Sequence, residues 1–278
     1  MNGDAGAHRL KSATSVWLAA IAVLGTLAFH GYLRADWLYD DHVLIVESSW
    51  YERPLAFGDL TSDLGKPLTG RKIGYWRPGE LLLFRAAHAV FAKDPFGWRA
   101  LTLSLHLAAA FALFFWARRI LGDERSAGLA ALLFAVHPAH GEIIAVANQM
   151  NSAAEGLLVF LALYFFTRGS LTAGAGACAA AVALRESGVM IPFAMFWLAL
   201  TDKGRRSEHR RAAVASFAVV ICYLAARTAV VGLSVQSASS PILCLPALAF
   251  PSRSRHAPLF CRCRLFYRSV TDRRTAGR

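Results

Sequence analysis

The stretch SVWLAAIAVLGTLAFHGYL, residues 15–33, is apolar along its length and contains no Asp, Glu, Lys or Arg. A helix that crosses the hydrocarbon core of a bilayer needs about 20 consecutive, mostly apolar residues. Arg9 and Lys11 precede the stretch and no small-residue cleavage pattern follows it, so we interpret it as a retained span rather than a cleaved signal peptide. The sequence therefore predicts an integral membrane protein.

The composition of the whole chain agrees with this interpretation. Hydrophobic residues make up 56% of the sequence and charged residues only 17%, whereas soluble domains average about 25% charged residues. The net charge is +12, but the basic residues lie in short clusters between apolar runs, which excludes a nucleic-acid-binding surface. The five cysteines show neither a zinc-binding nor a disulfide spacing.

Further apolar runs predict an all-α, polytopic bundle of about seven transmembrane helices. The candidate spans after the first are Phe96–Trp116, Ala127–Val146, Ala153–Phe166, two short helices over about 171–184 and 188–201, and Ala212–Leu233. Within the polar segment 34–95, the run Glu80–Phe91 is short and carries Arg85 and His88, so we expect an interfacial helix there.

Basic clusters set the expected orientation, because positive charge collects on the cytoplasmic side. Placing Arg9, Arg118, Arg168 and the cluster 203–211 inside leaves residues 1–14 cytoplasmic and makes 34–95 a long extracytoplasmic loop. The short helices must then turn back at Arg185 and Glu186. The loop, the sequence HPAHGE at 137–142 and this turn all fall on the outer side, which predicts one site at that face.

The tail differs from the transmembrane domain expected over residues 15–233. Residues 234–278 contain many Arg and Ser residues, no Lys and no Glu, and show no helical period. We expect either a disordered end or the product of a frameshift, in which case the chain would be a truncated copy of a longer protein.

Adjacent carboxylates, Asp40 and Asp41, follow the first span within the sequence YDDHV. Ionisable groups at a membrane boundary are candidates for a general base or for metal ligands, although a solvated start of a loop gives the same pattern. No cofactor is required by the sequence. If a divalent cation binds, its candidate ligands are Asp40, Asp41 and Glu142.

The remaining candidates are polar residues at predicted helix ends. His137, His140 and Glu142 follow an apolar helix that Pro138 interrupts, and could bind a phosphate-bearing ligand or orient a carboxylate. Arg77 follows Tyr75-Trp76 and could contact a lipid phosphate. Arg185 and Glu186 form either part of a site or a pair that neutralises itself.

Four short motifs together resemble those of the GT-C membrane glycosyltransferases, most closely the TMTC-type O-mannosyltransferases and their bacterial relatives. In chain order the motifs are YDD, YWRP, HPAHGE and LRESGVMIP. The resemblance covers residues 15–232. Arg185 stands where that family has Lys, and no tetratricopeptide repeat is visible. The resemblance implies a catalytic Asp40 or Asp41, a cavity lined by His137, His140 and Glu142, and phosphate contacts from Arg77 and Arg185.

It also implies transfer of a sugar, with inversion, from a polyprenyl- or dolichyl-phosphate donor to a hydroxyl of an unidentified acceptor on the outer face. The alternative is a transporter of a lipid-linked or polar substrate, or another non-enzymatic polytopic protein. Among the 30 basic residues only 5 are Lys, which favours a high-GC bacterium. We therefore expect an inner-membrane protein whose site faces the periplasm.

Overall fold

The computed structural model describes residues 3–232, with side chains from Thr14 onward. Its secondary structure is helical throughout this range, with no strand, as the sequence predicts. The tail expected over 234–278 lies outside the described residues. The first span belongs to a long helix, α1 (Gly3–Phe29), which a 3-10 turn, η1 (His30–Arg34), extends.

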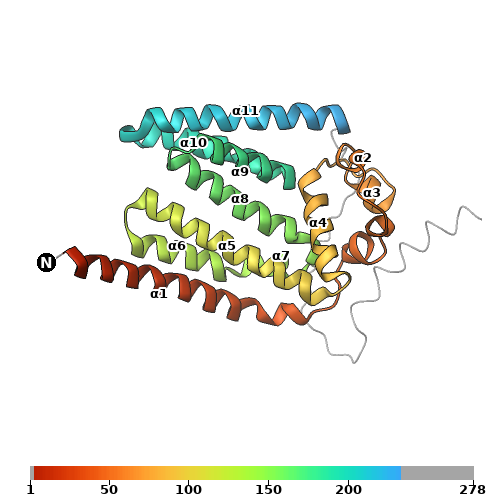
Figure 1. Cartoon of the computed structure of the whole chain (residues 1–278), viewed down its shortest axis with the longest axis horizontal. Helices are drawn as coiled ribbons and strands as arrows, with labels where there is room; N and C mark the ends of the chain where they lie inside the picture. The colour runs from red at the N-terminus through yellow and green to blue at the C-terminus, as the bar shows by residue number, and fades with distance from the viewer. Residues whose placement is uncertain (1–2, 233–278) are drawn as a thin grey trace, which may run out of the picture. The chain divides into compact units, whose positions relative to one another are not determined.

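Helices that follow the first loop form the body of the bundle, together with α1 (Figure 1). They are α5 (Pro95–Leu121), α6 (Glu124–Val136), α8 (Met150–Thr167), α9 (Leu171–Leu184), α10 (Ile191–Thr201) and α11 (Arg206–Val231). Helix α5 packs against α6 and α8, α8 against α9, and α11 against α9 and α10, while α1 lies against α6.

Four helical segments of the described chain are long and apolar enough to cross a membrane: Thr14–Arg34, Pro95–Leu121, Ala147–Thr167 and Lys203–Val231. The third expected span is broken: α6 ends before His137-Pro138, and the chain bends by 44° into Pro138–Ala145, which contains α7 (Gly141–Ala145). Proline cannot continue the hydrogen-bonding of α6, which explains the break. The protein is thus a multi-pass membrane protein, and residues 3–232 contain four candidate spans by length and composition, or five if the bent pair is counted as one.

Helix α9 and the segment Glu186–Thr201 are shorter than these spans. They form two helices joined at Arg185, where the sequence predicts the turn. Beyond Arg185 the 3-10 helix η6 (Glu186–Met190) folds back on α9. A Cβ at Gly188 would lie 3.0 Å from the backbone nitrogen of Val182, so this close approach favours glycine.

The first loop, residues 34–95, is folded rather than irregular. It contains a π-helical turn, η2 (His42–Val46), and the short helices η3 (Ser49–Glu52), α2 (Phe57–Leu60) and α3 (Gly65–Thr69). The longer helix α4 (Pro78–Phe91) ends the loop; it contains the expected helix Glu80–Phe91 and begins two residues earlier. Trp50, Leu64 and Phe84 of the loop form one buried core with Trp98 and Met150 of the bundle.

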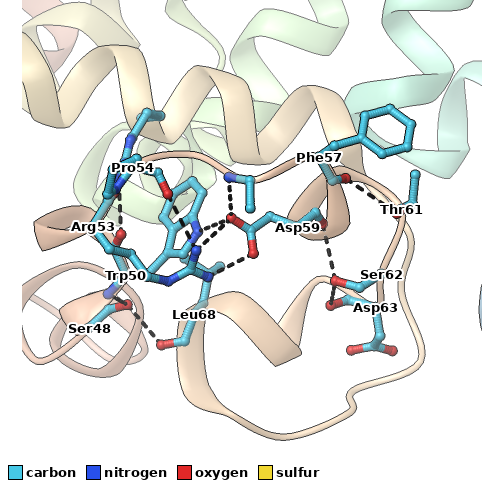
Figure 2. A network of polar contacts seen from close by, with 12 residues as sticks. Ser48, Trp50, Arg53, Pro54, Phe57, Asp59, Thr61, Ser62, Asp63 and Leu68 are labelled. Carbon is cyan, nitrogen blue, oxygen red and sulfur yellow. Dashed lines mark hydrogen bonds and ion pairs between the residues drawn. The ribbon is translucent and has the colours of Figure 1, made fainter.

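Buried carboxylates hold the first loop together (Figure 2). Asp59 accepts hydrogen bonds from the indole Nε1 of Trp50 at 3.1 Å, from the backbone of Ala56 and from the guanidinium of Arg53. The hydrogen bond from Arg53 is the main reason that the pKa of Asp59 falls to about 2. Asp63 accepts hydrogen bonds from three backbone amides, those of Gly65, Ile73 and Gly74. These polar contacts therefore fix the loop in addition to its buried apolar core.

Candidate functional site

The two adjacent carboxylates of YDDHV lie in different environments. Asp41 is fully buried, and its carboxylate accepts hydrogen bonds from the backbone amides of Leu38 (3.1 Å), Ala147 (3.1 Å) and Asn148 (2.8 Å). Asp41 therefore links the start of the first loop to the turn that leads into α8. Such bonds to a carboxylate are stronger than neutral hydrogen bonds.

Asp40, in contrast, is exposed. Tyr39 immediately before it has a φ of 48°, in the left-handed region that non-glycine residues adopt rarely. This backbone conformation accompanies the turn that leaves Asp40 at the surface and Asp41 inside. The structure thus separates the pair into one solvent-accessible carboxylate and one that is enclosed by backbone donors.

A cavity of about 500 Å³ lies among α5, α7, α8 and the turn at Arg185. Three residues predicted from the sequence line it, namely His140, Glu142 and Arg185. They are joined by polar residues that the sequence reasoning missed: His106, Gln149, Ser152, Glu155 and Ser187. The cavity therefore combines a cation, two carboxylates and two imidazoles within one polar space.

Arg185 is directed to α8 rather than to its neighbour Glu186. Its Nη1 donates to the side-chain oxygen of Gln149 at 3.0 Å and to the hydroxyl of Ser152. The backbone of Arg185 is extended, with φ at −159°, which sends successive side chains in different directions. Within the described residues Arg185 forms no ion pair, so its charge faces the cavity without a bonded carboxylate.

Glu186 instead pairs with Arg77 of the YWRP motif. The guanidinium of Arg77 lies 2.7 Å from Glu186 Oε2 and 3.3 Å from Glu80 Oε2, and it covers the ring of Tyr75 at 4.3 Å. Burial by itself lowers the pKa of Arg77, but the two carboxylates raise it above its ordinary value. Arg77 is therefore a fixed cation that joins the end of the first loop to the turn at Arg185.

Glu80 and Glu186 are unusual carboxylates. Glu80 is 4% exposed, and burial raises its pKa even though Arg77 opposes the shift. The Oε1 atom of Glu186 is buried and has no hydrogen-bond partner among the described residues. A buried acceptor without a donor is costly, so this atom is suited to receive a donor from a ligand or from water.

The imidazoles of HPAHGE have separate surroundings. His137 is exposed and its Nδ1 accepts a hydrogen bond from the backbone of Ala139. His140 lies within 3.0 Å of the carbonyl oxygen of Phe134, and its ring centroid is 4.7 Å from that of His106 in α5. Glu142 is exposed at the cavity. Only the second half of the motif, His140 and Glu142, therefore reaches the cavity lining.

The predicted site residues are brought together in part. His140, Glu142 and Arg185 line one cavity, while Arg77 and Glu186 form an ion pair next to Arg185. Asp40, Asp41 and His137 are outside the lining, although Asp41 binds Asn148, which adjoins the lining residue Gln149. Among the side chains described from Thr14 to Gly232, no three His, Cys, Asp or Glu residues are grouped as metal ligands, and Asp40, Asp41 and Glu142 are not brought together as such a group.

Taken together, the spans and the cavity define an integral, multi-pass helical membrane protein with a polar cavity among its helices. The chain is similar to protein O-mannosyl-transferase Tmtc1 of Drosophila melanogaster, with 36% identity over 135 residues. It is also similar to protein O-mannosyl-transferase TMTC2 of Mus musculus and TMTC1 of Homo sapiens, each with 29% identity, over 149 and 157 residues.

These matches confirm the resemblance to the TMTC-type proteins that the motifs predict. They cover 46% to 54% of this chain but only 16% to 18% of each relative. No family model and no solved structure matches the chain. The chain thus spans only about a sixth of the length of the curated relatives it matches.

Proposed function

We propose that this chain provides the transmembrane catalytic region of a glycosyltransferase, which moves mannose from a polyprenyl- or dolichyl-phosphate donor to a hydroxyl of a protein acceptor. The observation that carries the proposal is Arg185, a cation that faces a polar cavity without an ion-pair partner in the described chain. The relatives are named protein O-mannosyl-transferases, which supports the choice of sugar and acceptor.

In this proposal Arg185 binds the phosphate of the donor. A guanidinium offers several N–H donors in a planar fork and suits phosphate oxygens. It would stabilise the charge that develops on the leaving lipid phosphate. Because Arg77 already pairs with Glu80 and Glu186, we assign it a positioning role, in which it holds the turn that carries Arg185.

The acceptor side of the reaction needs a base. The acceptor oxygen would attack the anomeric carbon, the bond from that carbon to the phosphate oxygen would break, and the phosphate would keep the electron pair. We assign removal of the hydroxyl proton to Asp40, which lies outside the cavity lining but whose carboxylate is accessible to an acceptor, whereas that of Asp41 is occupied by three backbone donors. His140 and Glu142 would hydrogen-bond the sugar.

We further propose that the cavity opens on the side of the membrane that carries the first loop, the periplasmic side of a bacterial inner membrane. This follows from the basic clusters at the opposite helix ends and from the low Lys content. The acceptor would then approach through the first loop, and the donor from the lipid beside α8.

The test is transfer of radiolabelled mannose from polyprenyl phosphate in membranes that contain the chain. Arg185→Gln should lower transfer by about a hundredfold, as removal of one donor to a developing charge does elsewhere. Arg168→Gln, at the far end of α8, is the matched control and should leave transfer unchanged. Equal transfer by both variants would refute the assignment. Movement of labelled lipid across the membrane without transfer would favour the transporter instead.

A further inference from the structure

A second cavity, of about 410 Å³, lies at the other end of the bundle, where α5 and α10 end and α11 begins. Its polar lining includes Arg119, Asp202, Arg205 and His209, and Leu198 is among its apolar residues. Arg119 is 13 residues beyond His106 along α5, or about 20 Å at 1.5 Å per residue. This cavity is therefore separate from the site proposed for transfer.

Arg119 is held in place at one edge of its guanidinium. Its Nε donates to the carbonyl oxygen of Thr167, at the end of α8, at 2.8 Å. Among residues 14–232 Arg119 forms no ion pair, which leaves its terminal amino groups available. Arg205 is exposed and adds a second cation to the lining.

His209 gives the strongest indication of a ligand. It is 1% exposed, and its Nε2 lies 3.1 Å from Asp202 Oδ2. Its other nitrogen, Nδ1, is buried and has no hydrogen-bond partner in the described part of the chain. Because the Asp202 carboxylate accepts from Nε2–H, the Nδ1 atom is the one polar atom of the ring left to a ligand, as an acceptor in the neutral ring and as a donor in the protonated ring. A ligand oxygen would satisfy this otherwise costly buried group.

The charge balance of the cavity favours an anion. Asp202 is the acidic residue of the lining. Its carboxylate already accepts hydrogen bonds from the backbone amides of Gly204 and Arg205 and contacts the ring of His209. The same stretch of the chain, outside the lining, carries the exposed cations Lys203, Arg206, Arg210 and Arg211 and one exposed carboxylate, Glu208. Leu198 and Ile120 offer an apolar wall beside these polar groups.

We propose that this cavity binds a phosphate ester, with Arg119 and Arg205 donating to its oxygens and the free Nδ1 of His209 forming a further hydrogen bond with the ligand. An anionic phospholipid would place its headgroup among these donors and its acyl chains along the apolar wall, as basic pockets between membrane helices do. Phosphate in solution offers the same oxygens without the chains. The proposal is independent of the transfer reaction, so either one can fail alone.

The experiment is native mass spectrometry of the purified full chain in a neutral detergent, titrated separately with phosphatidylglycerol and with inorganic phosphate. Arg119→Gln and Arg205→Gln should each weaken binding of the ligand about tenfold, the expected loss of a charge-assisted hydrogen bond. The controls are the neighbours Arg118→Gln, whose side chain contacts Thr14 and Glu124, and Arg206→Gln, which is outside the lining. They should change binding less than twofold.

The two ligands identify the source of the phosphate group. If phosphatidylglycerol binds more tightly than inorganic phosphate, and this binding is weakened in the cavity variants, the ligand is a lipid headgroup. If the two bind equally well and both are weakened in the cavity variants, the ligand is a soluble phosphate held by the same donors. Arg205 is exposed, so its variant remains informative even if Arg119→Gln unfolds. Binding that is absent, or that falls equally in cavity and control variants, would overturn the proposal.

Discussion

The adjacent residues Asp40 and Asp41 should respond in opposite ways to the same substitution. Asp41→Asn replaces one carboxylate oxygen with an NH₂ group that cannot accept from Leu38, Ala147 or Asn148. At least one hydrogen bond to a charged acceptor is lost and a buried amide is left without an acceptor. Together these effects should lower the free energy of unfolding by about 3 kcal/mol.

For a chain of this length, that loss corresponds to a fall in Tm of about 6–12 °C. The assay is thermal unfolding of both variants in the same detergent, followed by transfer at a temperature where each is folded. Asp40→Asn, at an exposed carboxylate, should leave Tm within about 1 °C and abolish transfer. An unchanged Tm in Asp41→Asn, or full transfer by Asp40→Asn, would refute the division of roles.

Further predictions concern the first loop and its contact with the turn at Arg185. Because Arg53 lowers the pKa of Asp59 to about 2 from 3.8, the stabilisation is present above pH 4 and is lost as the pH falls toward 2. Pepsin cleavage of the loop, measured relative to that of an unfolded substrate at each pH, should therefore rise over that range by an amount equivalent to about 1–2 kcal/mol, allowing for the half-exposed Arg53, and Asp59→Asn should remove this rise. Arg77→Gln leaves Glu80 and Glu186 without their cation and should lower the free energy of unfolding by about 3 kcal/mol. The double variant Arg77→Gln/Glu186→Gln should recover a part of this loss. Additive losses of the two single variants in thermal unfolding would contradict a direct ion pair. A Cβ at Gly79 would lie 3.0 Å from backbone atoms of Ala183, so Gly79→Val should lower stability by about 1–3 kcal/mol, and an unchanged Tm would contradict this close packing.

The course of the helices could be predicted because its signals are local. Apolar runs define the long helices, Pro138 ends α6, and the charged pair Arg185-Glu186 interrupts an apolar stretch at the point where α9 ends. Each of these depends on residues next to one another in the sequence. The bounds 171–184 predicted for the first short helix therefore agree with Leu171–Leu184.

The site could be predicted only in part, because side-chain direction and distant partners decide it. Asp41 bonds to amides more than a hundred positions away, which its own neighbours do not reveal. Arg185 and Glu186 separate because of one extended residue, so they do not neutralise each other as one interpretation allowed. His106 and Glu155 were missed among apolar residues, although a carboxylate inside a candidate span is itself a signal of function.

Occupation of the cavity at Arg185 is the most direct test of the proposed function. A photoactivatable analogue of polyprenyl-phosphate mannose can be cross-linked to the chain in membranes, and the labelled residues identified by mass spectrometry. We predict labelling of α7 and the start of α8, displaced by unlabelled donor and strongly reduced in Arg185→Gln but not in Arg168→Gln. Labelling that spreads over the lipid-facing helices, or that is the same in both variants, would contradict a donor phosphate bound by Arg185.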